Sequence, residues 1–103
     1  MSLLPDELRH KLPRLHSQQN DPNPIVYIHF YTPDSLSSWW ATEGSFEADD
    51  FRLFGYVRGR EEGWQYFLLS ELEQIRDFEG RSVECDLDFE PGLFSDVVPA
   101  PED

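Results

Sequence analysis

The chain has 103 residues, of which 21 are Asp or Glu and 8 are Lys or Arg, so its formal net charge at pH 7 is −13. This length suits a single domain, and an aromatic content of 15% is too high for a disordered acidic chain. A protein of this charge repels nucleic acid and anionic membranes, which excludes both as direct partners, and attracts basic protein surfaces.

The first predicted element is a short helix over residues 5–12, with acids in its first turn and bases in its last turn. Pro13 ends this helix, because proline cannot continue the backbone hydrogen bonds. Residues 17–24 contain only Ser, Gln, Asn, Asp and Pro, which is typical of a loop. Residues 25–31 are β-branched, aromatic and apolar on both faces, which predicts a central strand.

Three further strands are predicted over residues 39–43, 51–58 and 63–69, which are rich in aromatic and aliphatic side chains. Gly55 lies inside the second of them and indicates a bulge or a close approach of neighbouring backbone. Short connections between successive strands favour an antiparallel arrangement.

A second helix is predicted over residues 70–78, with Ser70 as N-cap and the Glu73 side chain reaching back to it. Its expected core-facing residues are Leu72, Ile75 and either Phe78 or Gln74. Residues 82–90 then predict a fifth strand, which Pro91 closes.

These elements predict an α+β fold, with an antiparallel sheet of about five strands and two short helices in the order α-β-β-β-β-α-β. The helices are expected to cover one face of the sheet. The domain is expected to span residues 1–98, and residues 99–103 are expected to form a flexible tail.

Negative charge is concentrated in the second half of the chain. Residues 1–42 carry four acids and three bases, whereas residues 43–103 carry 17 acids and five bases. Residues 84–90 alternate strictly between acidic and apolar side chains. In a strand, carboxylates two residues apart lie on one face, ~6.8 Å from each other. Successive phosphates of a DNA strand are separated by a similar ~6–7 Å, so this row predicts a mimic of a nucleic-acid backbone.

Two other interpretations of this row stay open. A charged outer face also protects an edge strand from aggregation. A metal site needs oxygens that converge on one point, whereas a strand spreads its carboxylates apart. Residues 47–50 are also acidic, but they lack the central glycine of a calcium loop. No metal and no cofactor is therefore predicted.

The predicted partner-binding surface combines this row with other acids and one tryptophan. Its residues are Glu84, Asp86, Asp88, Glu90, Asp49, Asp50, Glu71, Glu73 and Trp40. Trp39 and Trp40 point to opposite faces if they share a strand. One of them is therefore either an exposed interface anchor or a cover for the far face of the sheet.

The sequence contains no nucleophile-elbow, phosphate-loop or dinucleotide motif, which predicts that the protein is not an enzyme. His29 lies in the central strand and is expected to be packed and hydrogen-bonded. Cys85, on the apolar side of its strand among acids, is expected to be a buried, inert thiol. A single cysteine and the lack of any long apolar run predict a cytoplasmic protein.

Seven segments, taken in order, carry a resemblance to a known family. They read LLPDELR at residues 3–9, NDP at 20–22, FYTPDS at 30–35, WWATE at 39–43, FGYVRG at 54–59, YFLLSELE at 66–73 and VECDLDF at 83–89. Together they resemble a bacterial domain-of-unknown-function family of small acidic proteins found on plasmids, conjugative elements and prophages. The resemblance implies no reaction and no catalytic residues, and it is weakest over residues 44–50 and after Pro91.

The mobile-element setting implied by this resemblance favours one class of function. Incoming mobile DNA must survive host nucleases, and an acidic DNA mimic protects it by occupying the basic channel of a nuclease. The expected function is a non-enzymatic acidic binding protein, a DNA-mimicking inhibitor in anti-CRISPR or anti-restriction defence. Its expected partner is a basic nucleic-acid-binding protein or nuclease complex. The alternative is an accessory or structural protein of a mobile element that acts through homodimerisation or another protein–protein interface.

Overall fold

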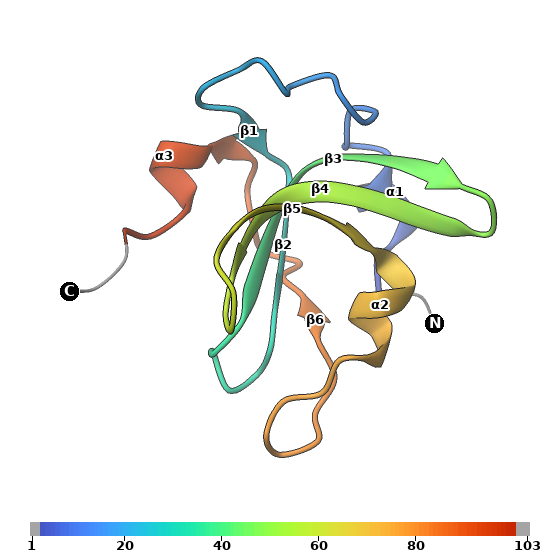
Figure 1. Ribbon diagram of the computed structural model, residues 1–103, viewed down its shortest axis with the longest axis vertical. Coiled ribbons are helices and arrows are strands. Elements are labelled where there is room, and N and C mark those ends of the chain that lie inside the picture. The colour runs from blue at the N-terminus through green and yellow to red at the C-terminus, as the bar shows by residue number, and fades with distance from the viewer. Residues whose placement is uncertain (1–2, 101–103) are drawn as a thin grey trace.

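A five-stranded antiparallel sheet organises the fold in a computed structural model, which describes residues 3–100 (Figure 1). In chain order the elements are α1 (Asp6–Arg9), β1 (Ile25–Val26), β2 (Ile28–Tyr31), β3 (Ser38–Glu47), β4 (Asp50–Arg58), β5 (Gly63–Leu68), α2 (Leu69–Gln74), β6 (Glu84–Cys85), β7 (Gly92–Leu93) and α3 (Phe94–Val97). The order of strands in the sheet is β5-β4-β3-β2-β6. The predicted α+β class and the five-stranded antiparallel sheet are confirmed.

The predicted strand over residues 25–31 is divided in two at Tyr27. β2 pairs with β3, whereas β1 pairs with β7 in a separate two-stranded sheet. The amide of Tyr27 still donates to the carbonyl of Ala41, at 2.9 Å. Tyr27 therefore still bonds to β3, whereas the two residues before it pair with β7.

Side chains pack on both faces of the sheet, in two separate clusters. Phe30 and Leu72 belong to the first cluster, against which leucines of the α1 region and α2 pack. Val26 and Trp40 belong to the second, which Phe94 of α3 helps to cover. Figure 1 shows α1 and α2 on one side of the curved sheet and α3 on the other. The two predicted helices share a face as expected, and α3, which the sequence did not predict, covers the opposite face.

Gly55 lies where β3 and β4 approach each other most closely. It pairs with Ala41, and the register shifts between Ala41 and Glu43, so Thr42 is an extra residue in β3. A Cβ at position 55 would lie 2.0 Å from the carbonyl oxygen of Trp40. Only a residue without a side chain fits this contact, so the predicted close approach of backbone at Gly55 is confirmed.

The start and end of α2 differ from the prediction. The helix begins at Leu69, and the Glu71 side chain reaches back to accept a hydrogen bond from the amide of Leu68, at 2.9 Å. Ser70 is not the cap, because its hydroxyl donates to Asp50 instead. The backbone becomes extended at Ile75. Phe78 is therefore exposed rather than core-facing, whereas Leu72 is buried as expected.

The predicted tail falls partly within the structure. The carbonyl of Pro99 accepts a hydrogen bond from Nη1 of Arg58, at 2.7 Å, whereas residues 101–103 lie outside the described residues. None of the helices within residues 3–100 has the length and apolarity needed to cross a membrane.

Candidate functional site

The acidic segment, residues 84–90, does not form the predicted continuous strand. β6 contains only Glu84 and Cys85, which pair with Tyr31 and Phe30. The carboxylate of Asp86 then accepts a hydrogen bond from the amide of Asp88, at 3.0 Å. Aspartate side chains compete with strand pairing in this way, because they offer the backbone a local acceptor.

This turn removes the alternation of side chains between two strand faces, on which the predicted row of carboxylates depended. The carbonyl of Asp86 also accepts from the amide of Phe89, at 3.3 Å, and Leu87 is exposed rather than aligned with Cys85. The prediction of four carboxylates on one strand face is therefore wrong. The acidic segment is a two-residue strand followed by a turn.

The carboxylates of the acidic segment have different surroundings. Glu84, Asp88 and Glu90 are exposed, and within residues 3–100 none of them forms an ion pair. Asp86 is half-buried, with Oδ2 at 3.5 Å from Nδ1 of His29. Three of the four predicted residues are thus available to a partner, and the fourth is engaged inside the protein.

Tyr31 reports the negative charge of the acidic segment. Its pKa is raised, first by desolvation and then by the charges of Glu84 and Asp86, with smaller contributions from Cys85 and Asp88. A nearby negative charge disfavours the ionised phenol, so these carboxylates add to the rise in the pKa of Tyr31. Glu84 pairs directly with Tyr31, and Asp86 lines one pocket with it.

The other predicted acids lie around the turn between β3 and β4 and on α2. Asp49, Asp50 and Glu73 line one groove of about 410 Å³, together with Arg9. β2 and β3 separate β4 from β6 in the sheet, so this group is distinct from the acidic segment.

Most of these acids have internal partners. Asp50 accepts from the hydroxyl of Ser70, which helps to hold the pKa of the Asp50 carboxyl below its usual value. Glu73 accepts from the amide of Leu3 at 3.2 Å, and Glu71 holds the start of α2. These carboxylates stabilise the fold locally, which leaves the acidic segment as the better candidate surface.

Trp40 is buried, so it is not an exposed anchor. Its ring stacks on His29, with centroids 5.2 Å apart and planes 6° from parallel, and the guanidinium of Arg58 lies 5.4 Å from the ring centroid. Trp39 is also buried, in the cluster on the opposite face. Of the two interpretations of this pair, the one in which a tryptophan covers the far face of the sheet is confirmed.

His29 is packed and hydrogen-bonded, as predicted. Its Nε2 lies 3.2 Å from Oγ of Ser38, and its Nδ1 faces Asp86. Burial lowers the pKa of His29, although the carboxylate of Asp86 acts in the opposite direction. Ser38, His29 and Asp86 thus contact one another in the same sequence of side chains as the Ser-His-Asp triad of serine hydrolases. Their spacing along the chain did not indicate this arrangement. The contact with Asp86 is at the long limit of a hydrogen bond and links β2 to the acidic segment.

Cys85 was expected to be a buried, inert thiol, and it is only partly buried. Desolvation, with a smaller contribution from Asp86, raises its pKa to about 11. Because the thiolate is the reactive form, a thiol with this pKa is a weak nucleophile at neutral pH. Within residues 3–100, no three His, Cys, Asp or Glu side chains are placed to hold a metal ion.

Glu43 is a buried carboxylate that the sequence did not single out. Its two oxygens accept hydrogen bonds from the amides of His16, at 2.7 Å, and Gln18, at 2.6 Å. The Gln18 side chain in turn bonds to the backbone of Ile25 and to the carbonyl of Thr42. This network attaches the first loop to the sheet. Its partners are backbone groups far away in the sequence, so no local pattern could have revealed it.

Comparison with known proteins gives one match. A family model described as a protein of unknown function (DUF2958) matches residues 3–95. No curated protein and no solved structure matches the chain.

Proposed function

Because the chain belongs to the DUF2958 family, whose function is unknown, we propose its function from its own surface: a non-enzymatic acidic protein that binds a basic partner protein. The partner class is a nucleic-acid-binding protein or nuclease complex. Such proteins present clustered Lys and Arg, which a strongly acidic surface attracts.

The observation that carries this proposal is the set of exposed, unpaired carboxylates in the acidic segment. Glu84, Asp88 and Glu90 have no base partner within residues 3–100. After desolvation, the charges of Glu84, Asp86 and Asp88 contribute to the raised pKa of Tyr31. Carboxylates that are not neutralised internally are free to accept charge-assisted hydrogen bonds from Arg or Lys of a partner.

The geometry changes the expected mode of recognition. A turn presents its carboxylates as a cluster, whereas a continuous strand would have presented them as a row with the spacing of phosphates. We therefore propose that the acidic segment binds a compact basic patch of the partner. Complementary charge of this kind accelerates association and selects the partner.

The finer form of the proposal is that the partner is a nuclease of a host defence system, of either the restriction or the CRISPR type. The family resemblance, with its plasmid, conjugative-element and prophage setting, and the sign of the net charge support this form. By occupying the basic channel, the protein would compete with DNA without any catalytic step.

The test is capture of partners from a host lysate by the immobilised chain. Basic nucleic-acid-binding proteins are expected to be retained at about 0.1 M salt and released at about 1 M, because the screening length falls from about 10 Å to about 3 Å. A variant with Glu84→Lys, Asp88→Lys and Glu90→Lys is expected to lose them.

The matched control carries Glu7→Lys, Glu61→Lys and Asp96→Lys, which make the same change in net charge at other exposed positions. This control is expected to retain the captured proteins. Equal loss in both variants would refute the assignment to the acidic segment. Recovery of no basic partner by the unmodified chain would refute the proposed function.

One observation favours a second candidate, an accessory protein that acts as a homodimer. β5 is an edge strand without a charged residue, and its Trp64 and Tyr66 are 41% and 42% exposed. Uncharged, aromatic edge strands pair readily with other strands. A second copy offers the same strand in antiparallel orientation about a two-fold axis.

This candidate predicts a dimer in size-exclusion chromatography with light scattering. Trp64→Lys is expected to give a monomer, because a lysine on an edge strand opposes pairing. The added positive charge lowers the net repulsion between two acidic chains, so loss of the dimer could not be ascribed to repulsion. Leu36→Lys, at an exposed position outside β5, should leave the dimer intact. A strict monomer at high protein concentration would refute this candidate.

A further inference from the structure

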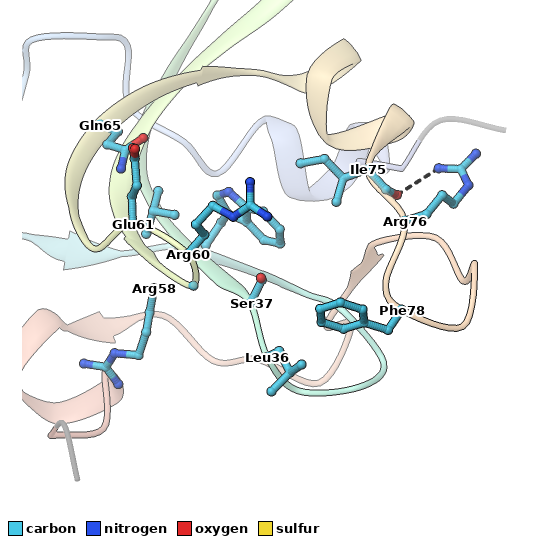
Figure 2. Close-up of a pocket in the computed structure, with 12 residues that line it drawn as sticks. Leu36, Ser37, Arg58, Arg60, Glu61, Gln65, Ile75, Arg76 and Phe78 are labelled. Atoms are coloured by element: carbon cyan, nitrogen blue, oxygen red, sulfur yellow. Dashed lines mark hydrogen bonds between the residues drawn. The ribbon is translucent and has the colours of Figure 1, made fainter. Parts of the chain in front are cut away.

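A groove with basic and apolar walls lies away from the acidic segment. It has a volume of about 810 Å³ and lies between the turn after β2, the end of β4 and the chain that follows α2 (Figure 2). Its main lining residues are Leu36, Trp39, Val57, Arg60, Ile75 and Phe78. This volume is within the roughly 300–1,000 Å³ of small-molecule sites.

The apolar part of the groove has a buried floor and exposed walls. Trp39 and Val57 are floor residues that belong to the core, and Ile75 packs against the same cluster. Phe78 is 90% exposed and Leu36 is 59% exposed. Figure 2 shows Phe78 and Leu36 along one edge, with Arg60 above the middle of the groove. An aromatic side chain so exposed has nearly its whole ring available to a ligand.

Three arginines line the same groove. Arg60 is exposed and, among residues 3–100, forms no hydrogen bond or ion pair. Nη1 of Arg76 donates to the carbonyls of Glu73 and Ile75, which fixes a second positive charge at the rim. Arg58 contributes less, because its guanidinium turns away from Arg60 and binds Pro99 (Figure 2).

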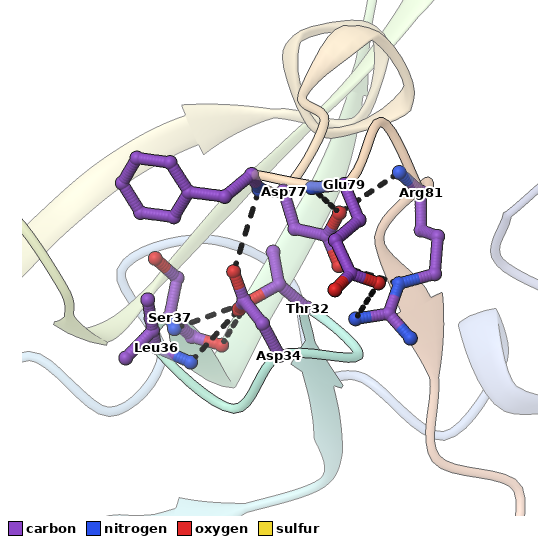
Figure 3. A network of polar contacts seen from close by, with 8 residues as sticks. Thr32, Asp34, Leu36, Ser37, Asp77, Glu79 and Arg81 are labelled. Carbon is purple, nitrogen blue, oxygen red and sulfur yellow. Dashed lines mark hydrogen bonds and ion pairs between the residues drawn. The ribbon is translucent and has the colours of Figure 1, made fainter.

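The carboxylates nearest to the groove do not neutralise Arg60. Asp34 accepts from the Leu36 amide, at 3.0 Å, and from the Thr32 hydroxyl, at 2.8 Å (Figure 3). Asp77 is paired with Arg81, at 2.9 Å. Glu61 lines the groove and forms no ion pair in the described part of the chain. Asp34 keeps its charge, because the donors that it accepts from are neutral. The two arginines therefore face two charged carboxylates, Asp34 and Glu61, and within residues 3–100 Arg60 pairs with neither of them.

We propose that this groove binds an aromatic anion, a small molecule in which a carboxylate, sulfonate or phosphate group is attached to a planar apolar body. The planar body lies against Phe78 and the floor at Trp39, and the anionic group faces Arg60. Guanidinium groups both pair with anions and stack on aromatic rings, which suits this class of ligand.

A pair of probes with the same aromatic body tests the role of charge. Anilinonaphthalenesulfonate is anionic, and phenylnaphthylamine is the same body without the sulfonate. The sulfonate is expected to bind more tightly to the folded protein, and its fluorescence titration gives the Kd. Arg60→Gln should weaken binding of the sulfonate by roughly 3- to 10-fold, as expected for a lost charge-assisted contact, and leave the neutral probe unchanged.

Arg14→Gln is the matched charge control, because Arg14 is exposed, lies outside the groove and also has no side-chain partner within residues 3–100. Phe78→Ala should weaken both probes. Its matched control is Phe46→Ala, at a phenylalanine that is 69% exposed on the β3–β4 hairpin.

Amide chemical shifts locate the probe. Those of residues 36–37, 59–61 and 75–78 should change on titration, and naphthoate should displace the probe more effectively than decanoate. Unchanged sulfonate binding in Arg60→Gln, equal effects of Phe46→Ala and Phe78→Ala, or shifts outside these residues would overturn the proposal. Preferential displacement by decanoate would overturn the aromatic class of ligand.

Discussion

Replacing Gly55 with alanine is expected to lower the free energy of unfolding by about 3–5 kcal/mol. The added Cβ would lie 2.0 Å from the Trp40 carbonyl oxygen and 2.8 Å from the Cα of Ala41. Both are backbone atoms of β3, which cannot rotate away as a side chain can. The two longest strands would have to separate at the bulge. Such a loss is a large part of the roughly 5–15 kcal/mol that stabilises a typical domain.

Urea denaturation followed by tryptophan fluorescence measures this effect. Gly59→Ala is the control, because a Cβ there meets mainly the Ser37 side chain, with Oγ at 2.8 Å, and this side chain can rotate. The control is expected to lose no more than about 1 kcal/mol. Equal midpoints and slopes for the two variants would contradict the steric argument.

Replacing Glu43 with alanine is expected to cost about 3 kcal/mol, because two amides lose their acceptors in a buried place. Glu43 is fully buried, and its oxygens accept from the amides of His16 and Gln18. Glu43→Gln should cost less, because the amide side chain keeps one of the two acceptor oxygens.

Hydrogen exchange distinguishes this mechanism from general destabilisation. In Glu43→Ala, the amides of His16 and Gln18 should exchange faster by a larger factor than amides in the centre of β4. The control, Glu84→Ala, removes an exposed carboxylate and should stay within about 0.5 kcal/mol of the unmodified protein. Uniform acceleration across the sheet would contradict a local role for Glu43.

Strand β4 shows what local pattern can predict. Residues 51–58 were expected to form a strand, and β4 runs over Asp50–Arg58 with buried positions at every second residue from Phe51 to Val57. β4 has a neighbour on each side, so ladder bonds on both edges hold its aromatic and aliphatic residues in a strand. The strand class and the antiparallel order followed from such segments and from their short connections.

The acidic segment shows where the same pattern misleads. Its sequence alternates more strictly than that of β4, but β6 lies at an edge and pairs with β2 over two residues only. Few ladder bonds then oppose the local hydrogen bond between Asp86 and Asp88. An alternating sequence therefore forms a strand only where a neighbouring strand can pair with it. The length over which the neighbouring strand pairs cannot be seen in the alternating segment itself.

The start of α2 has a similar cause. Ser70 was the expected cap, with the Glu73 side chain reaching back to it. The hydroxyl of Ser70 is instead bonded to Asp50, which is twenty residues earlier in the chain, and Glu71 takes the capping role. A contact that is distant in sequence thus engages the side chain that local pattern predicted as the cap.

Composition alone determined the sign of the charge and the presence of a folded, aromatic-rich core. Tertiary structure decided which carboxylates are free: Glu84, Asp88 and Glu90 have no ion pair within residues 3–100, whereas Asp86 and Glu43 face inward. It also brought Arg60 and Phe78, which are distant in the sequence, to the lining of one groove. The physical reason is the range of the interactions. Propensity and alternation act between neighbours along the chain, whereas burial and pairing depend on residues that only the folded sheet brings together.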